Sequence, residues 1–194
     1  MKICVFGAAS SHIDDRYIKA AEELGEKMAK RGHSLVFGAG STGMMGAVAR
    51  GVKRGGGYAH GVMPKFFKDD GVEIPNENCN EIIYTESMSD RKKQMEDMAD
   101  AFIILPGGIG TIEEFFEVFT LLQVGRHSRA IAIYNIGGYY DKLKEFLLEC
   151  SDKKFITRQC VEICAYLNQA DEILDYLENF DSAKVVWKDL LYGF

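Results

Sequence analysis

The stretch Ala101-Phe-Ile-Ile-Leu-Pro-Gly-Gly-Ile-Gly-Thr-Ile-Glu-Glu114 combines a strand, a turn and the start of a helix. Its first five residues form an apolar run without alternation, which is typical of a strand buried on both faces. Pro106 and three glycines end this run, and apolar residues at helical spacing follow from 115 to 122, before Gly125. The stretch therefore predicts a buried strand that passes through a glycine-rich turn into a helix, with Thr111 as the helix N-cap.

The same alternation continues in both directions along the chain. The other expected strands are the apolar runs at 3–6, 35–37, 59–63, 82–84, 130–134 and 163–167. The other expected helices lie at 18–32, 44–51, 89–98, 141–150 and 170–180. This pattern predicts an α/β, Rossmann-like doubly wound fold, with a mostly parallel sheet of about seven strands and helices on both faces. Only residues 64–80 break the alternation, and we expect them to form a long mobile loop near the site.

Length and composition favour one compact globular domain. The chain has 194 residues, enough for a single core, which we place at 2–180 with a C-terminal tail at 181–194. Hydrophobic residues make up 47% and charged residues 27%, which excludes disordered, collagen-like and coiled-coil chains. The net charge of -6 provides no general field for nucleic acid or an anionic membrane, so neither is an expected partner.

Cysteine usage and hydropathy bear on the compartment. The five cysteines are scattered, and none forms a Cys-x-x-Cys pair, which predicts reduced thiols and no zinc site. No apolar run approaches the roughly 18 residues of a membrane span, and no signal peptide is recognised. We therefore expect a cytoplasmic protein.

Three glycine-rich segments follow predicted strands, at 7–11, 38–43 and 106–111, and should meet at one edge of the sheet. The second segment, Gly38 to Gly43, matches G-x-G-x-x-G, so a dinucleotide site is one interpretation and a simple tight turn is another. A dinucleotide site would place this loop after the first strand and a carboxylate at the end of the next one. Residues 60–64 contain no carboxylate, which leaves a mononucleotide site as a third interpretation.

The third segment is the most specific of the three. The N–H groups at the start of the predicted helix form an anion cradle suited to a phosphate. No lysine follows as a P-loop requires, so hydrolysis of a nucleoside triphosphate is not expected. The residues of this expected phosphate site are Gly107, Gly108, Ile109, Gly110 and Thr111.

Glu114 is the candidate for chemistry at a nucleotide's ribose. It lies one turn into the helix that would hold the phosphate, although Thr111-x-x-Glu114 also has the spacing of a capping box. A carboxylate there can activate water and stabilise an oxocarbenium-like transition state. Its neighbour Glu113 is the less favoured alternative.

Arg91 and Lys92 lie at the start of the helix that precedes the strand leading into the third loop. Because that helix opens at the same sheet edge, both side chains can face the ligand. Cations at a helix start oppose the helix dipole, which favours an anionic partner over the alternative that both are merely solvated.

These residues resemble the Lonely Guy (LOG) family of cytokinin riboside 5'-monophosphate phosphoribohydrolases, often mislabelled lysine decarboxylases. The signature P-G-G-x-G-T-x-x-E is complete from Pro106 to Glu114, and M-x-x-R-K is present as Met88, Arg91 and Lys92. The resemblance covers residues 2–180. It departs from the family pattern at Ala39, at Asp90 and in the first loop, 7–10.

The resemblance implies roles for individual residues. Arg91 and Glu114 resemble the catalytic pair, while Lys92 and residues 108–111 resemble the nucleotide-binding residues. Two further substrate contacts are implied at Thr120 and, as the nearest counterpart of a family glutamate, at Glu73. We also expect three residues of the first two loops to line the pocket, namely Ser10, Gly40 and Gly43.

The expected reaction is hydrolysis of the N-glycosidic bond of an adenine-type nucleoside 5'-monophosphate, with the base plain or N6-substituted. It gives the free base and ribose 5-phosphate and uses no metal or redox cofactor. The resemblance also implies a homodimer in which the partner helps to close each pocket. The alternative is a non-catalytic nucleotide or cofactor carrier on the same fold, in which Arg91 and Glu114 are dispensable.

Overall fold

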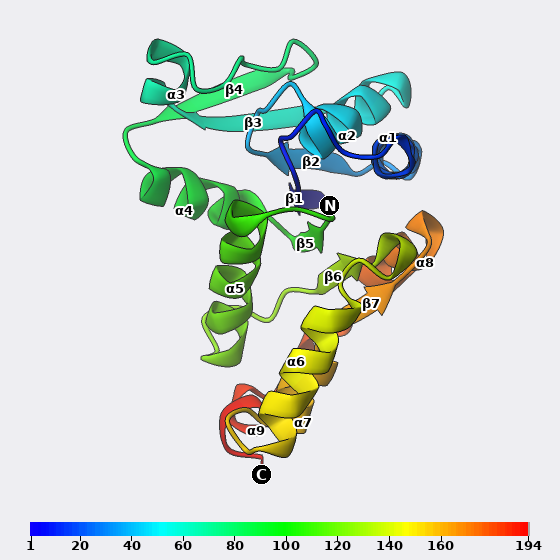
Figure 1. Cartoon of the computed structure of the whole chain (residues 1–194), viewed down its shortest axis with the longest axis vertical. Coiled ribbons are helices and arrows are strands. Elements are labelled where there is room, and N and C mark those ends of the chain that lie inside the picture. Colours follow the sequence, from blue (N-terminus) through cyan, green and yellow to red (C-terminus); the bar gives the residue numbers. More distant parts are fainter. Residues whose placement is uncertain (194) are drawn as a thin grey trace.

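A seven-stranded, all-parallel sheet forms the centre of the molecule in the computed structural model, which describes residues 1–193 (Figure 1). The strands are β1 (Lys2–Phe6), β2 (Ser34–Phe37), β3 (Ala59–Pro64), β4 (Glu81–Thr85), β5 (Ala101–Ile104), β6 (Ile131–Tyr134) and β7 (Ala165–Leu167). The α-helices are α1 (Asp15–Lys30), α2 (Gly43–Arg54), α3 (Lys65–Asp69), α4 (Met88–Met98), α5 (Ile109–Gln123), α6 (Asp141–Asp152), α7 (Arg158–Glu162), α8 (Ala170–Glu178) and α9 (Trp187–Tyr192). The predicted α/β doubly wound architecture is confirmed.

The strand order is β4-β3-β2-β1-β5-β6-β7. The chain therefore builds one half of the sheet outward from β1 to β4, and then returns to place β5 on the other side of β1. The strand order thus reverses between β1 and β5, which makes this position a topological switch point. The connections that follow β1 and β5 leave in opposite directions, so a crevice opens beyond the carboxyl ends of these two strands. The first and third glycine loops follow these two strands.

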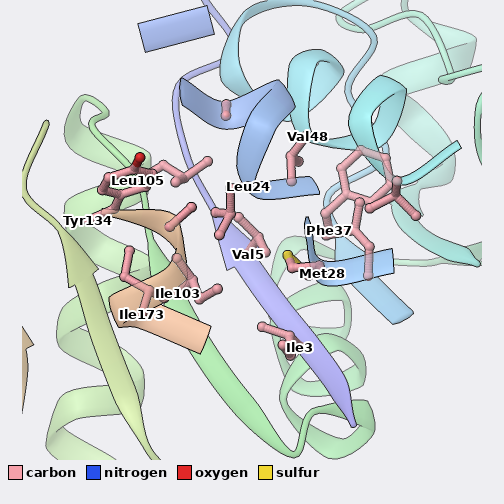
Figure 2. Close-up of a cluster of buried hydrophobic side chains, with 14 of the residues drawn as sticks. Ile3, Val5, Leu24, Met28, Phe37, Val48, Ile103, Leu105, Tyr134 and Ile173 are labelled. Carbon is pink, nitrogen blue, oxygen red and sulfur yellow. The ribbon is translucent and has the colours of Figure 1, made fainter. Parts of the chain in front are cut away.

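Both faces of the sheet are buried because successive side chains of a strand point to opposite sides. In β1, Ile3 and Val5 join a core with α1, α2 and α8, whereas Cys4 and Phe6 join a second core with α4 and α5. Figure 2 shows the first core, where Leu24 of α1 packs over β1. This double burial explains why the strands lack polar alternation.

The structure corrects two local expectations. Thr111 is not the N-cap of the helix after the third loop: α5 begins at Ile109, its N-cap is Gly108, and no side chain caps it. Residues 64–80 are not one loop, because β3 continues to Pro64 and α3 follows immediately. Proline is well tolerated before a first helical turn, since its missing N–H would have no partner there.

The C-terminal segment forms helical structure that the sequence pattern did not predict. Figure 1 shows α9 beside α7, far from the β4 edge of the sheet, and α9 also contacts α5. Leu190 of α9 is buried, and its carbonyl accepts a 2.8 Å hydrogen bond from the Thr157 hydroxyl. The last residue of the expected tail, Phe194, lies outside the described residues. Across residues 1–193, every helix is too short or too polar to cross a membrane.

Candidate active site

A cavity of about 360 Å³ opens where the first and third glycine loops meet. Its volume lies within the range of about 300–1,000 Å³ that is typical of small-molecule sites. Its wall is formed by the loop after β1, by α2, by α3 and the segment after it, by α4, and by the start of α5 with the glycine before it. The lining residues are Gly7, Ala8, Ala9, Ser10, Met45, Phe67, Glu73, Arg91, Gly108, Gly110, Thr111 and Glu114.

Arg91 and Glu114 form a buried ion pair in the wall of this cavity. Arg91 Nη1 donates to Glu114 Oε1 at 3.0 Å, and the two side chains are only 7% and 11% exposed. Arg91 Nε also donates to the carbonyl oxygen of Val62 in β3 at 3.3 Å. Residues 23 positions apart in the sequence are thus held together at one end of the sheet.

Local capping explains how α4 presents Arg91. The helix begins at Met88 because the Ser87 hydroxyl accepts from the N–H of Asp90 and donates to the Asp90 carboxylate at 2.7 Å. Asp90, one of the departures from the family pattern, therefore stabilises the helix start. Arg91 follows on the buried side of this first turn.

Two carboxyl groups face the same cavity with raised pKa values. Burial raises the pKa of Glu114 above its ordinary value, although the Arg91 charge and hydrogen bond oppose the rise. Burial likewise raises the pKa of Glu73, and Arg91 again opposes it. Glu73 Oε1 is buried without a hydrogen-bond partner. Such a pair of perturbed acids beside one arginine in a cavity is a feature of functional sites.

The start of α5 supplies backbone donors beside these carboxyl groups. The first N–H that bonds back within this segment is that of Ile112, which donates to the Gly108 carbonyl at 3.0 Å. The N–H groups of residues 109–111 precede it and have no partner inside the helix. Gly108 and Gly110 line the cavity, and a Cβ on either would meet open space. An anion can therefore approach this backbone closely.

The first loop is supported by the start of α2. Ala8 carbonyl accepts from the N–H of Met44 at 2.8 Å, and the Thr42 hydroxyl donates to the Ala9 carbonyl at 2.6 Å. Gly43 packs directly against the backbone of this loop. These contacts bring Ser10 to the cavity, whereas Gly43 lies behind the wall.

Several predicted site residues lie outside the cavity wall. Lys92 forms ion pairs with Glu113 and Glu117 of α5, the latter at 2.8 Å. Burial acts to lower the pKa of Lys92, but the two carboxylates outweigh it and raise the pKa. Ile109 is 89% exposed and Thr120 is also exposed.

Gly107 and Gly40 lie behind the cavity wall and pack against residues that line it. Gly107 packs against the side chain of Thr111, and its carbonyl accepts from the Tyr139 hydroxyl at 2.8 Å. Gly40 packs against Glu73. Neither contributes to the lining of the cavity.

Sequence reasoning missed two apolar lining residues, Met45 and Phe67. Met45 lies in α2, beyond the second glycine loop, and Phe67 lies in the short helix α3. The signal for α3 was Pro64 followed by six residues without glycine, which is compatible with a short helix. Met45 carried no signal, because its residue type is equally common in cores.

Among residues 1–193, no group of three or more histidine, cysteine, aspartate and glutamate side chains is arranged to hold a metal ion.

Comparisons with known proteins place these features in context. A family model described as "Possible lysine decarboxylase" matches residues 45–177. A cytokinin riboside 5'-monophosphate phosphoribohydrolase of Arabidopsis thaliana is 37% identical over 195 residues, covering 97% of this chain and 89% of that protein. A probable enzyme of the same name from Oryza sativa subsp. japonica is 37% identical, covering 92% of this chain and 71% of that protein.

Solved structures share the fold at much lower identity. A molybdenum cofactor binding protein from Rippkaea orientalis has a TM-score of 0.70 at 16% identity, covering 91% of this chain and 94% of that one. A molybdenum cofactor carrier protein from Chlamydomonas reinhardtii has a TM-score of 0.67 at 17% identity, covering 91% and 95%. At such identities the likeness concerns the fold alone.

Proposed function

We propose, from the premise that this chain belongs to the LOG family, that it hydrolyses the N-glycosidic bond of an adenine-type nucleoside 5'-monophosphate. The products are the free base and ribose 5-phosphate. The observation that carries this proposal is the buried pair of Glu114 and Arg91, which lies in the cavity wall one helical turn from the free N–H groups of α5.

The 5'-phosphate is the group that the α5 start would bind. Its oxygens accept from the N–H groups of residues 109–111, and the helix dipole adds about 1 kcal/mol. Ser10 lines the same cavity, and its hydroxyl can serve as a further donor. Because these contacts are made by a part of the substrate that does not react, their binding energy serves to position the sugar carbon C1'.

Glu114 would then act on the sugar. As the C1'–N9 bond breaks, positive charge develops on C1' and the ring oxygen, and the Glu114 carboxylate stabilises that charge. Glu114 also accepts a proton from the water whose oxygen forms the new bond to C1'. The electron pair of the broken bond leaves with the base, which takes up a proton from solvent, and Glu114 then returns the proton it accepted to solvent. Arg91 holds the Glu114 carboxylate in place and opposes the rise in its pKa that burial causes.

The reaction and its phosphate requirement are tested together. Purified protein is expected to convert AMP to adenine and ribose 5-phosphate, and to use adenosine with a kcat/KM lower by about 10²–10³-fold, because charge-assisted hydrogen bonds contribute about 1.5–3 kcal/mol each. Chromatography of the base and an assay of the sugar phosphate measure both. Equal use of AMP and adenosine would contradict the assignment of the α5 start to the phosphate.

The carrier function is the second candidate, because proteins described as molybdenum cofactor binding and carrier proteins also have this fold. A carrier would bind AMP or another phosphate ester at the same cavity and release no adenine. The AMP assay therefore separates the two functions, since binding without any product supports the carrier.

The acid limb of the pH profile is a further expected result. Burial raises the pKa of Glu114, so its proton is held to higher pH and the ionised fraction falls earlier on acidification. We expect the kcat/KM for AMP to fall as the pH is lowered. The midpoint of this fall should lie at a pH above the ordinary glutamate pKa of about 4.3. The AMP phosphate itself titrates near pH 6. The pH dependence of AMP binding to the Glu114→Gln variant measures this phosphate titration, so that it can be removed from the kinetic profile. A midpoint of the corrected acid limb at or below about pH 4.3 would contradict the raised pKa of Glu114.

A further inference from the structure

The guanidinium of Arg91 is fitted against the second glycine loop. Its Nε and Nη1 have the hydrogen bonds to Val62 and Glu114, and its Nη2 rests against Gly38 at the end of β2. A methyl group on Gly38 would overlap Nη2 and lie 3.0 Å from Cζ, tighter than the 3.4–4 Å of ordinary contacts. The three atoms nearest to that methyl group all belong to Arg91.

Gly40, two residues further on, has the same relation to Glu73. A methyl group there would overlap Glu73 Oε1 and lie 3.0 Å from its Cδ. It would also lie 2.6 Å from Cε of Met45, the flexible end of that side chain. The two glycines of G-x-G thus face the two polar side chains that reach the cavity from α4 and from the segment after α3.

The loop has little freedom to move away from these side chains. Asn76 is 2% exposed, its N–H donates to the Ala39 carbonyl at 3.0 Å, and its side-chain amide donates to the Gly40 carbonyl at 2.8 Å. Gly40 also pairs with Pro75 in an isolated antiparallel bridge. Because Glu73, Pro75 and Asn76 are close in the chain, this clamp fixes Glu73 relative to the loop.

We propose that Gly38 and Gly40 are positioning residues, and that the segment Gly38-Ala39-Gly40 seats the side chains of Arg91 and Glu73 instead of a ligand's pyrophosphate. In a dinucleotide fingerprint, a missing Cβ lets the backbone approach the pyrophosphate closely. Here the space left by the missing Cβ atoms is filled by the protein's own side chains. The G-x-G motif thus positions side chains of the protein and does not bind a dinucleotide. A carboxylate at 60–64, which would hold the ribose of a dinucleotide, is therefore not needed.

The Gly38 contact predicts a specific defect. A methyl group must displace the guanidinium, and the hydrogen bond from Nη1 to Glu114 weakens with it. Since Arg91 opposes the effect of burial on Glu114, its displacement raises the pKa of Glu114 further. We expect Gly38→Ala to lower kcat for AMP by about 10²-fold with a much smaller change in KM, because the phosphate cradle is untouched.

A double-mutant cycle tests whether the defect acts through Arg91. The four proteins are the unsubstituted chain, Gly38→Ala, Arg91→Met and the double variant. The readouts are kcat and KM for AMP and the carboxyl titration of Glu114 by ¹³C NMR. Gly38→Ala is expected to raise the Glu114 pKa in the Arg91 background and to leave it unchanged in the Arg91→Met background. Equal effects of Gly38→Ala in both backgrounds would overturn the proposal.

General loosening of the fold is controlled by Gly55→Ala. A methyl group on Gly55 also crowds its surroundings, lying 2.6 Å from Ala29 Cβ, but it does so at the far end of α2. This variant is expected to lose stability without moving the Glu114 titration. If Gly38→Ala does not fold, recovery of folded protein in the Arg91→Met background supports the proposal, and failure in both backgrounds contradicts it.

The kinetic arm of this test rests on the proposed function, whereas the titration arm does not. Should the chain release no adenine from AMP, the coupling of Gly38 to the Glu114 pKa through Arg91 remains measurable.

A matching double-mutant cycle of Gly40→Ala and Glu73→Ala tests the second contact, with AMP affinity as the readout. Gly40→Ala is expected to weaken AMP binding only while Glu73 is present. An equal loss with and without Glu73 would overturn that half of the proposal.

Discussion

Replacing Glu114 with glutamine is expected to lower the rate of adenine release from AMP by about 10²–10⁴-fold. Glutamine has nearly the same size and keeps an oxygen that can accept from Arg91 Nη1, so the geometry of the pair is largely retained. It cannot take a proton from water, and it carries no charge to stabilise the developing oxocarbenium ion. The loss is therefore expected in kcat, with AMP binding retained.

Calorimetric titration with AMP measures binding, and product chromatography measures release. Glu149→Gln is the matched control, because Glu149 is an exposed residue of α6 whose ion pair with Lys153 lies on the surface. It should match the unsubstituted chain in both assays. Equal adenine release by the Glu114→Gln variant and the unsubstituted chain would defeat the role given to Glu114.

Removal of the Arg91 guanidinium has the second large expected effect. Arg91→Met keeps an unbranched stem but leaves Glu114 and Glu73 in a buried site without their cation, and both pKa values rise. Adenine release is expected to fall by about 10²–10³-fold at neutral pH, since less Glu114 is ionised and the carboxylate is no longer held. Breaking one partner of a buried pair is also expected to cost about 3 kcal/mol of unfolding free energy.

Two further variants separate charge from geometry. Arg91→Lys restores a positive charge but not the planar guanidinium that contacts Val62, Glu114 and Gly38 together, so it should recover little activity. Arg158→Ala removes an exposed arginine of α7 and should change neither rate nor stability measurably. Denaturant unfolding and the AMP assay are the measurements. Full activity of Arg91→Lys would show that charge alone suffices.

The sheet was predictable because a strand buried on both faces leaves a local signature. Apolar runs such as 3–6 and 101–105 carry the whole of this signature, and the structure has strands at these positions. Short helices were less predictable, since α3, α7 and α9 have too few residues for a helical period to show. The start of α5 was misplaced because Thr111 is a good N-cap residue, whereas the actual N-cap, Gly108, has no side chain to mark it.

The sequence by itself determined the sheet and the meeting of the glycine loops at one edge. It also determined the family of the chain, through the residues of the third loop. Only the tertiary structure decided which neighbouring side chain enters the cavity. Arg91 and Lys92 are adjacent, but successive helical residues point about 100° apart, so Arg91 reaches Glu114 while Lys92 turns to Glu113 and Glu117. What each group meets, including what fills the space beside Gly38, depends on elements distant in the chain.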